Sequence, residues 1–257
     1  MEAYERLMTA RDAKRPNIDF YINELFDDFI ELHGDRLYKD DKAIVAGIGI
    51  FHDIPVTVIG HRKGKDTQEN IECNFGMASP EGYRKAVRLM KQAEKFNRPV
   101  ITFVDTPGAY PGVEAESNGQ SNAIAESIAC MSNLKVPVIS IITGEGSSGG
   151  AIALAVADKV WMLENAVYSI LSPEGFASIM WKDASRAKEA CDIMKITAQE
   201  LYDFGIIDGV IRENKKFIVT LDGMLYEEIK NLKKKKPEVL VKERYMKFRK
   251  MDGLYNE

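Results

Sequence analysis

The spacing of apolar residues in the first hundred positions predicts two helices and two strands. Apolar side chains at helical spacing over residues 20–32 predict an amphipathic entry helix. The runs 44–51 and 54–59 are mostly apolar and flank two polar residues, so they predict strands joined by a tight turn. Residues 79–96 again follow a helical period, and Ser79-Pro80-Glu81 supplies an N-cap, a proline at the first helical position and an acid that suits the helix dipole.

From residue 100 onward, runs typical of strands and of helices alternate. Strands are predicted at 100–104, 136–142 and 159–163, and helices at 119–133 and 151–157. This alternation is typical of a parallel layer, and the hairpin before it makes the predicted sheet mixed and the fold class α/β. Beyond residue 209 the chain is rich in Lys and Glu, which predicts a helix pair ending in a solvated or partner-facing arm.

A glycine-rich turn follows the predicted strand 136–142, with the sequence Gly144-Glu145-Gly146-Ser147-Ser148-Gly149-Gly150-Ala151. A helix is predicted to follow, so its first N–H groups lack partners and its dipole adds positive potential. Gly149 and Gly150 have no Cβ, which lets a ligand oxygen approach the main chain. The turn therefore predicts an anion site, with Ser147 and Ser148 interpreted as capping groups.

The same turn satisfies a second motif, which the sequence leaves open. Gly144, Gly146 and Gly149 form G-x-G-x-x-G between a strand and a helix, and Glu164 follows about 20 residues later, as a dinucleotide site requires. A nicotinamide-dependent oxidoreductase therefore stays an alternative.

Two further motifs fail in this turn. A P-loop needs Lys and then Ser or Thr where this chain has Gly150 and Ala151. The G-x-S-x-G elbow of a hydrolase needs an acid and then a histidine later in the chain, but every histidine precedes the turn: His33, His52 and His61.

A second turn of this kind follows strand 100–104, with the sequence Asp105-Thr106-Pro107-Gly108-Ala109-Tyr110-Pro111-Gly112. Its two Pro-Gly pairs stiffen the backbone while leaving glycine free to adopt positive φ. If the strands before the two turns are parallel neighbours, both turns lie at one edge of the sheet. We expect this edge to carry the functional site.

Composition limits the classes of partner. The chain has 257 residues, 45% of them hydrophobic, which suits one domain spanning 1–257 with a core over about 15–212. The net charge of −4 gives no reason to expect nucleic acid. No apolar run reaches membrane-spanning length and residues 1–16 lack the core of a signal peptide, so we expect no membrane and a cytoplasmic location.

Cysteines and basic clusters add little specific chemistry. Cys73, Cys130 and Cys191 are too few and too widely spaced for a zinc site or a disulfide framework, so no metal is expected. Six basic residues could contact the phosphates of a ligand, although charged stretches are more often solvated faces: Arg62, Lys63, Lys65, Arg84, Lys85 and Arg88.

Four stretches together carry a family resemblance. They are 74–86, 105–112, 144–151 and 172–182, and the similarity is continuous from about Arg15 to Gly209. The chain resembles the α subunits of the carboxyltransferase component of bacterial acetyl-CoA carboxylase. The resemblance implies a crotonase-like (ClpP/crotonase) carboxyltransferase fold with helical elements at both ends.

The resemblance also implies a reaction and an assembly. A carboxyl group moves from carboxybiotin, carried on the biotin carboxyl carrier protein, to acetyl-CoA, which gives malonyl-CoA for fatty-acid synthesis. The expected partners are a zinc-bearing β subunit in an α2β2 complex, the carrier protein and biotin carboxylase. No metal is expected in this chain. The part after about Arg212 matches no pattern of the family.

Site residues carried over from the family fall on the two turns. The donors to the biotin ureido carbonyl are the N–H groups around Gly149, Gly150 and Ala151, with the donating pair open to within one residue. Gly108 and Ala109 are expected near the pocket wall, and Phe176 is a candidate for lining the biotin pocket. Because fixed N–H groups stabilise a developing oxygen anion without a proton, no acid or base from this chain is expected to take part.

One further alternative remains beside the oxidoreductase. A crotonase-like hydratase or isomerase would act on an acyl-CoA alone, without biotin. Dependence of activity on biotin and on a second chain would separate these classes.

Overall fold

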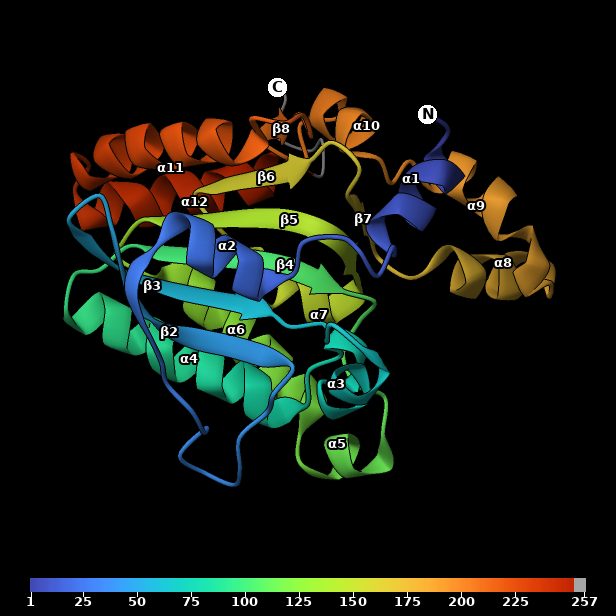
Figure 1. The fold of residues 1–257 in the computed structure, drawn as a ribbon, viewed down its shortest axis with the longest axis horizontal. Helices are drawn as coiled ribbons and strands as arrows, with labels where there is room; N and C mark the ends of the chain where they lie inside the picture. Colours follow the sequence, from blue (N-terminus) through green and yellow to red (C-terminus); the bar gives the residue numbers. More distant parts are fainter. Residues whose placement is uncertain (252–257) are drawn as a thin grey trace.

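The computed structural model describes residues 1–251, which form one mixed sheet with helices on both faces (Figure 1). The strand order is β1-β2-β3-β4-β5-β6-β8, with β7 paired to β5 outside this path. The strands are β1 (Asp27–Glu31), β2 (Ile44–Phe51), β3 (Ile54–His61), β4 (Val100–Thr106), β5 (Val138–Ser147), β6 (Lys159–Leu163), β7 (Val167–Ser169) and β8 (Gly209–Ile211). The first three are antiparallel and those from β3 to β8 along the path are parallel, so the predicted mixed α/β sheet is confirmed.

Helices of different parts of the chain cover the two faces. α2 packs on β3 and meets α11, whereas α4 and α6 pack on each other across the sheet from them (Figure 1). The helices are α1 (Ala3–Ala10), α2 (Ile18–Leu25), α3 (Thr67–Glu72), α4 (Pro80–Lys95), α5 (Val113–Ser117), α6 (Gln120–Asn133), α7 (Ser148–Ile152), α8 (Pro173–Trp181), α9 (Ala187–Met194), α10 (Ala198–Asp203), α11 (Phe217–Lys233) and α12 (Pro237–Lys250). Among residues 1–251, none of these helices is long and apolar enough to span a membrane.

Several elements follow the sequence closely. The β2–β3 hairpin is confirmed, and its turn residues His52 and Asp53 have φ of 46° and 61°, which suits a two-residue hairpin. Helix α4 is also confirmed, and its apolar face is buried in the core. Here the local pattern and the tertiary packing agree.

Two helix predictions have the wrong bounds. The segment 20–32 is helical only to Leu25, because β1 pairs antiparallel with β2 and draws the later apolar residues into the sheet. The helix expected at 151–157 is instead the five-residue α7, which ends at Ile152. Strand β5 runs on to Ser147, so the first half of the glycine-rich sequence is strand and the second half is α7.

The C-terminal helix pair is confirmed, and its second helix α12 packs on the rest of the fold; the end of the predicted solvated or partner-facing arm falls on residues 252–257, outside the described residues. Leu240 and Arg244 of α12 are 2% and 1% exposed. The Arg244 guanidinium donates to both carboxylate oxygens of Asp158, at 2.9 and 2.8 Å, and to the carbonyls of Met131 and Leu134 at 2.6 and 2.9 Å. These bonds hold α12 against the body of the domain.

We predict that Arg244→Met destabilises the fold by about 3–5 kcal/mol, because it leaves the carboxylate of Asp158 buried without its cation. Urea unfolding followed by circular dichroism measures this. The control is Lys235→Met on the exposed pair with Glu243, for which we expect a loss below about 1 kcal/mol. Equal effects of the two substitutions would contradict this view of α12.

Candidate functional site

The two predicted turns lie side by side at one edge of the sheet. Strands β4 and β5 are parallel neighbours, with Val104 opposite Ile142 and Thr106 opposite Gly146. The chain leaves both strands at the same level, toward Gly108 in one turn and α7 in the other. The prediction that the turns share an edge is confirmed.

Close packing between the turns explains two of their glycines. A Cβ on Gly150 would lie 2.8 Å from the nitrogen of Ala109 and 2.8 Å from the carbonyl carbon of Gly108, which real side chains do not tolerate. Gly108 has a φ of 145°, a conformation that favours glycine. The hydroxyl of Thr106 accepts from the N–H of Gly108 at 3.1 Å and donates to its carbonyl at 2.7 Å, which fixes this turn.

Main-chain donors are left free where the turns meet. Gly149 and Gly150 lie in the first turn of α7, where N–H groups have no helical acceptor, and no side chain caps this helix. Within residues 1–251, the N–H of Ala109 also has no acceptor. Ala151 lies one residue further into α7. Main-chain N–H groups without acceptors therefore lie close together where the turns pack.

Two details of the predicted turn are wrong. Ser147 does not cap α7, since its hydroxyl is buried without a partner in the described chain, and Ser148 has a φ of 60° and makes no capping bond. The five-residue α7 is also too short for a substantial macrodipole. The positive potential therefore comes from the individual N–H groups.

The dinucleotide alternative does not fit this backbone. Gly144 and Gly146 lie within β5 instead of in a turn, and Gly146 is opposite both Thr106 and Tyr168 of the neighbouring strands. Glu164 accepts from the N–H of Glu213 at 3.3 Å and so serves the connection after β8. The glycines of the motif thus do not form one phosphate-binding loop.

Acidic residues beside the turns are engaged in ion pairs. Asp105 lies 2.5 Å from Lys63 and accepts from the N–H of Glu145 at 2.9 Å. The guanidinium of Arg11 bridges Glu145 and Glu174, with shortest distances of 2.7 Å to each. Burial alone would lower the pKa of Arg11, but these two carboxylates raise it.

The N-terminal segment supplies site neighbours that the sequence did not reveal. Arg11 joins β5 to α8, and Arg15 donates to the carbonyl of Thr143 at 2.6 Å and pairs with Glu213 at 2.9 Å. These contacts span more than a hundred residues, so no local pattern predicts them. The segment also lines a cleft of about 430 Å³ beside Asp105 and Pro107.

Phe176 lies on α8, away from the glycine cluster in sequence and in packing. Its ring meets Trp181 of the same helix edge-on, with centroids 5.7 Å apart, and α8 packs on α9. Through Glu174 and Arg11, α8 is tied to the strand that leads into α7. The expected place of Phe176 in a biotin pocket stays a prediction.

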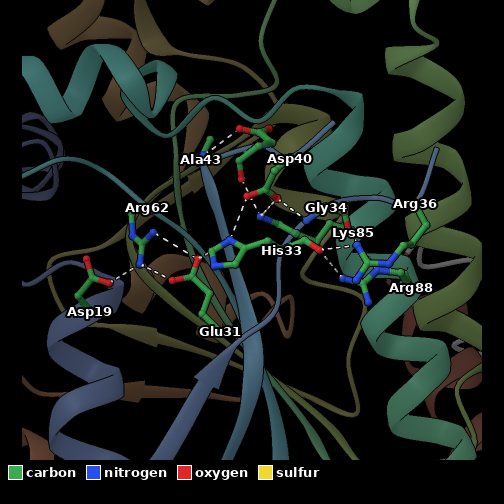
Figure 2. Close-up of polar contacts among 11 residues, drawn as sticks. Asp19, Glu31, His33, Gly34, Arg36, Asp40, Ala43, Arg62, Lys85 and Arg88 are labelled. Carbon is green, nitrogen blue, oxygen red and sulfur yellow. Dashed lines mark hydrogen bonds and ion pairs between the residues drawn. The ribbon is translucent and has the colours of Figure 1, made fainter. Parts of the chain in front are cut away.

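Most of the basic residues considered as phosphate contacts serve internal bonds. Figure 2 shows Arg62 between Asp19 and Glu31, and Lys85 directed at Asp40. Lys85 is fully buried, and its ammonium lies 2.7 Å from Asp40. The remaining members bond as follows: Arg84 to Asp35 and Glu81, Arg88 to the carbonyls of His33 and Gly34, and Lys63 to Asp105. These five side chains are thus engaged in internal bonds, Lys63 and Lys65 both line the cleft, and the phosphate role stays a prediction.

His61 lies beneath the turns, at the end of β3. The ring is 2% exposed, and burial lowers its pKa to about 4. It adjoins the main chain of Phe103 and Gly150, but neither ring nitrogen reaches hydrogen-bonding geometry in the described chain. His61 is therefore neutral at physiological pH.

Metal-binding groups are not assembled in the described part of the chain. Within residues 1–251, no set of three His, Cys, Asp or Glu side chains is arranged to hold a metal ion. Cys73, Cys130 and Cys191 are free thiols. The expectation that this chain carries no metal stays a prediction.

Comparison of the fold first defines a class. The structure matches transcarboxylase 12S, a crystal structure with methylmalonyl-coenzyme A bound, with a TM-score of 0.73 over 88% of this chain and 43% of that chain, at 19% sequence identity. The match shows a carboxyltransferase fold. The crotonase-like fold expected from the sequence is confirmed.

The sequence defines the family. The model of the acetyl co-enzyme A carboxylase carboxyltransferase-like family matches residues 1–252. The acetyl-coenzyme A carboxylase carboxyl transferase subunit alpha of Clostridium perfringens is 56% identical over 260 residues, covering 98% of this chain and 96% of that protein. A Clostridium tetani protein named as subunits beta/alpha is 54% identical, covering 97% of this chain and 45% of its own length.

The chain therefore belongs to the acetyl-CoA carboxylase carboxyltransferase family, with relatives of the alpha-subunit type. The resemblance stated from the sequence is confirmed, and the oxidoreductase alternative is wrong. The expectation that the family pattern ends near Arg212 is also wrong, since the match continues through α11 and α12.

We predict that His61 makes stability sensitive to acid. Its folded-state pKa of about 4 lies below its ordinary value of 6.5, so the unfolded chain takes up the proton first as pH falls. The contribution is fully present above pH 6.5 and is lost progressively as pH falls toward 4. Between pH 7 and pH 4 the unchanged protein should lose about 3 kcal/mol more than His61→Gln in urea unfolding. Equal losses in both proteins would contradict the assignment.

Proposed function

We propose that this chain is the α subunit of an acetyl-CoA carboxylase carboxyltransferase. With a β subunit it transfers the carboxyl group of carboxybiotin to acetyl-CoA, forming malonyl-CoA. Membership of the family supports the reaction class. The observation that carries the site is that Gly150 packs directly against the Gly108-Ala109 peptide, so that main-chain N–H groups of Gly149, Gly150 and Ala109 without acceptors lie where the two turns meet.

The turns suit the ureido group of biotin, which presents a carbonyl oxygen to be held. A Cβ on Gly150 would strike the Gly108-Ala109 peptide, so glycine alone lets the two turns meet. In the proposed complex, main-chain N–H groups that lack acceptors in this chain donate to the ureido carbonyl oxygen, which can only accept hydrogen bonds. Bound carboxybiotin supplies the carboxyl group and leaves negative charge on its ureido oxygen.

The chain's own contribution is to hold that charge. N–H groups of Gly149, Gly150 and Ala151 are the proposed donors, with Gly108 and Ala109 forming the adjoining wall. Fixed donors need no reorganisation when charge develops, and each is worth about 3 kcal/mol in the transition state of comparable enzymes. Thr106 keeps the Gly108 turn in place through its two hydrogen bonds.

The acidic side chains and the histidine near the turns are engaged in ion pairs or buried. Asp105 is held by Lys63, while Glu145 and Glu174 share Arg11. His61 is neutral and buried below the turns. These pairings support a site that works through main-chain dipoles, with the thioester held by the β subunit.

The assembly is also part of the proposal. The Clostridium tetani relative is named for both beta and alpha subunits in one chain, which supports a β partner for this one. We propose an α2β2 complex with a zinc-bearing β subunit, serving the biotin carboxyl carrier protein together with biotin carboxylase in the cytoplasm.

The test of the reaction uses the complex purified with its β partner. We predict that malonyl-CoA is decarboxylated only when both chains and free biotin are present. Turnover by this chain alone, or turnover that ignores biotin, would instead indicate a hydratase-like or other acyl-CoA enzyme and contradict the proposal.

We predict that Gly150→Val lowers kcat of the complex by at least about 100-fold, the loss expected on removing one oxyanion donor. The new side chain displaces the Gly108-Ala109 peptide. Gly223→Val is the control, because a Cβ there meets nothing within 4 Å. Circular dichroism checks that both variants fold, and near-normal turnover of Gly150→Val would remove these turns from the site.

A further inference from the structure

Buried polar groups without partners gather around Gly150. The hydroxyls of Tyr83 and Ser147 and both ring nitrogens of His61 are shielded from solvent and have no hydrogen-bond partner within residues 1–251. Ser147 precedes the turn directly, His61 adjoins the main chain of Gly150, and Tyr83 reaches it from α4. Such groups are uncommon in native proteins, and each calls for a physical reason.

Of these groups, the hydroxyl of Tyr83 lies directly against Gly150. Its side chain is fully buried, and its hydroxyl oxygen lies 2.9 Å from the position that a Cβ on Gly150 would occupy. The nitrogen of Ala109 and the carbonyl carbon of Gly108 lie 2.8 Å from that same position. The phenol, on α4, therefore lies next to the point where the two turns of the proposed site meet.

An unpaired buried hydroxyl destabilises the fold, because the group gives up its hydrogen bonds to water and gains none. Phenylalanine would fill the same space without this cost. Burial also raises the pKa of Tyr83, so the phenol stays protonated and keeps a dipole that can rotate. Residue 83 thus carries a hydroxyl that forms no hydrogen bond within the described residues.

We propose that Tyr83 is a positioning residue of the site, whose buried hydroxyl orients its O–H dipole toward the negative charge that develops at the Gly108–Gly150 junction. The inference rests on the proposed function. The hydroxyl adjoins the main chain at Gly150, and its dipole acts on the charge that the two turns hold. A dipole without a partner in the resting state gains its interaction only when charge appears, so it favours the transition state over the ground state.

The experiment compares Tyr83→Phe with Tyr21→Phe in the complex with the β partner, using malonyl-CoA and free biotin. Tyr21 is the control: its hydroxyl is also buried and unpaired, but it lies on α2, where its ring stacks on Phe103, and the charges that face it are those of Arg15, Glu213 and Asp105. Thermal unfolding of each variant is measured beside kcat and KM for biotin.

The proposal expects Tyr83→Phe to lower kcat about tenfold with KM unchanged, the effect of one hydrogen-bond-sized interaction. Its unfolding temperature should equal or exceed that of the unchanged protein. Tyr21→Phe should keep kcat and likewise unfold no earlier. An activity loss without a stability loss is the signature that a purely structural tyrosine does not give.

Two outcomes overturn the inference. Unchanged kcat in Tyr83→Phe shows that the hydroxyl has no part in turnover, and a joint fall of kcat and unfolding temperature shows a packing role. Both are judged against Gly150→Val: if that variant is inactive, the turns keep their proposed function and only the role of Tyr83 falls. If Gly150→Val is active, the proposed site itself fails.

Discussion

The parallel pairing of β4 with β5 is the constraint on which the proposed site depends. With Thr106 opposite Gly146, the chain leaves both strands at one level, and the two turns meet at Gly150 and the Gly108-Ala109 peptide. A shift of one residue in this register would separate the free N–H groups. The buried strands that hold the register are therefore as important to the site as the glycines themselves.

Long-range arginines then tie other elements of the fold to the sheet, and two of them, Arg11 and Arg15, do so near this edge. Arg11 holds α8 to β5 through two carboxylates, Arg15 joins the carbonyl of Thr143 to Glu213, and Arg244 fastens α12 through Asp158. Planar guanidinium groups suit such bridges because one side chain can satisfy several acceptors at once. These three arginines thus hold elements in place that are far apart in the sequence.

The sequence predicted those parts in which local pattern and packing agree. Helix α4 has its proline at the first position and an apolar face, the β2–β3 hairpin has its two-residue turn, and the family motifs located both glycine turns. It failed at β1, where pairing with a distant strand overrides helical spacing, and at α7, where β5 extends to Ser147. Arg11 and Arg244 bind Glu145 and Asp158, which lie 134 and 86 residues away, so no local pattern predicts these pairs. That the hydroxyl of Tyr83 is buried without a partner can be seen only in the folded structure.

The central claim is that main-chain N–H groups of this chain hold the ureido oxygen of biotin. The most direct test is a crystal structure of the complex with the β partner and biotin. The account predicts the ureido oxygen at about 2.9 Å, ordinary hydrogen-bond distance, from N–H groups of the Gly149–Ala151 turn. A biotin ring bound elsewhere, with those N–H groups facing only solvent, would contradict it.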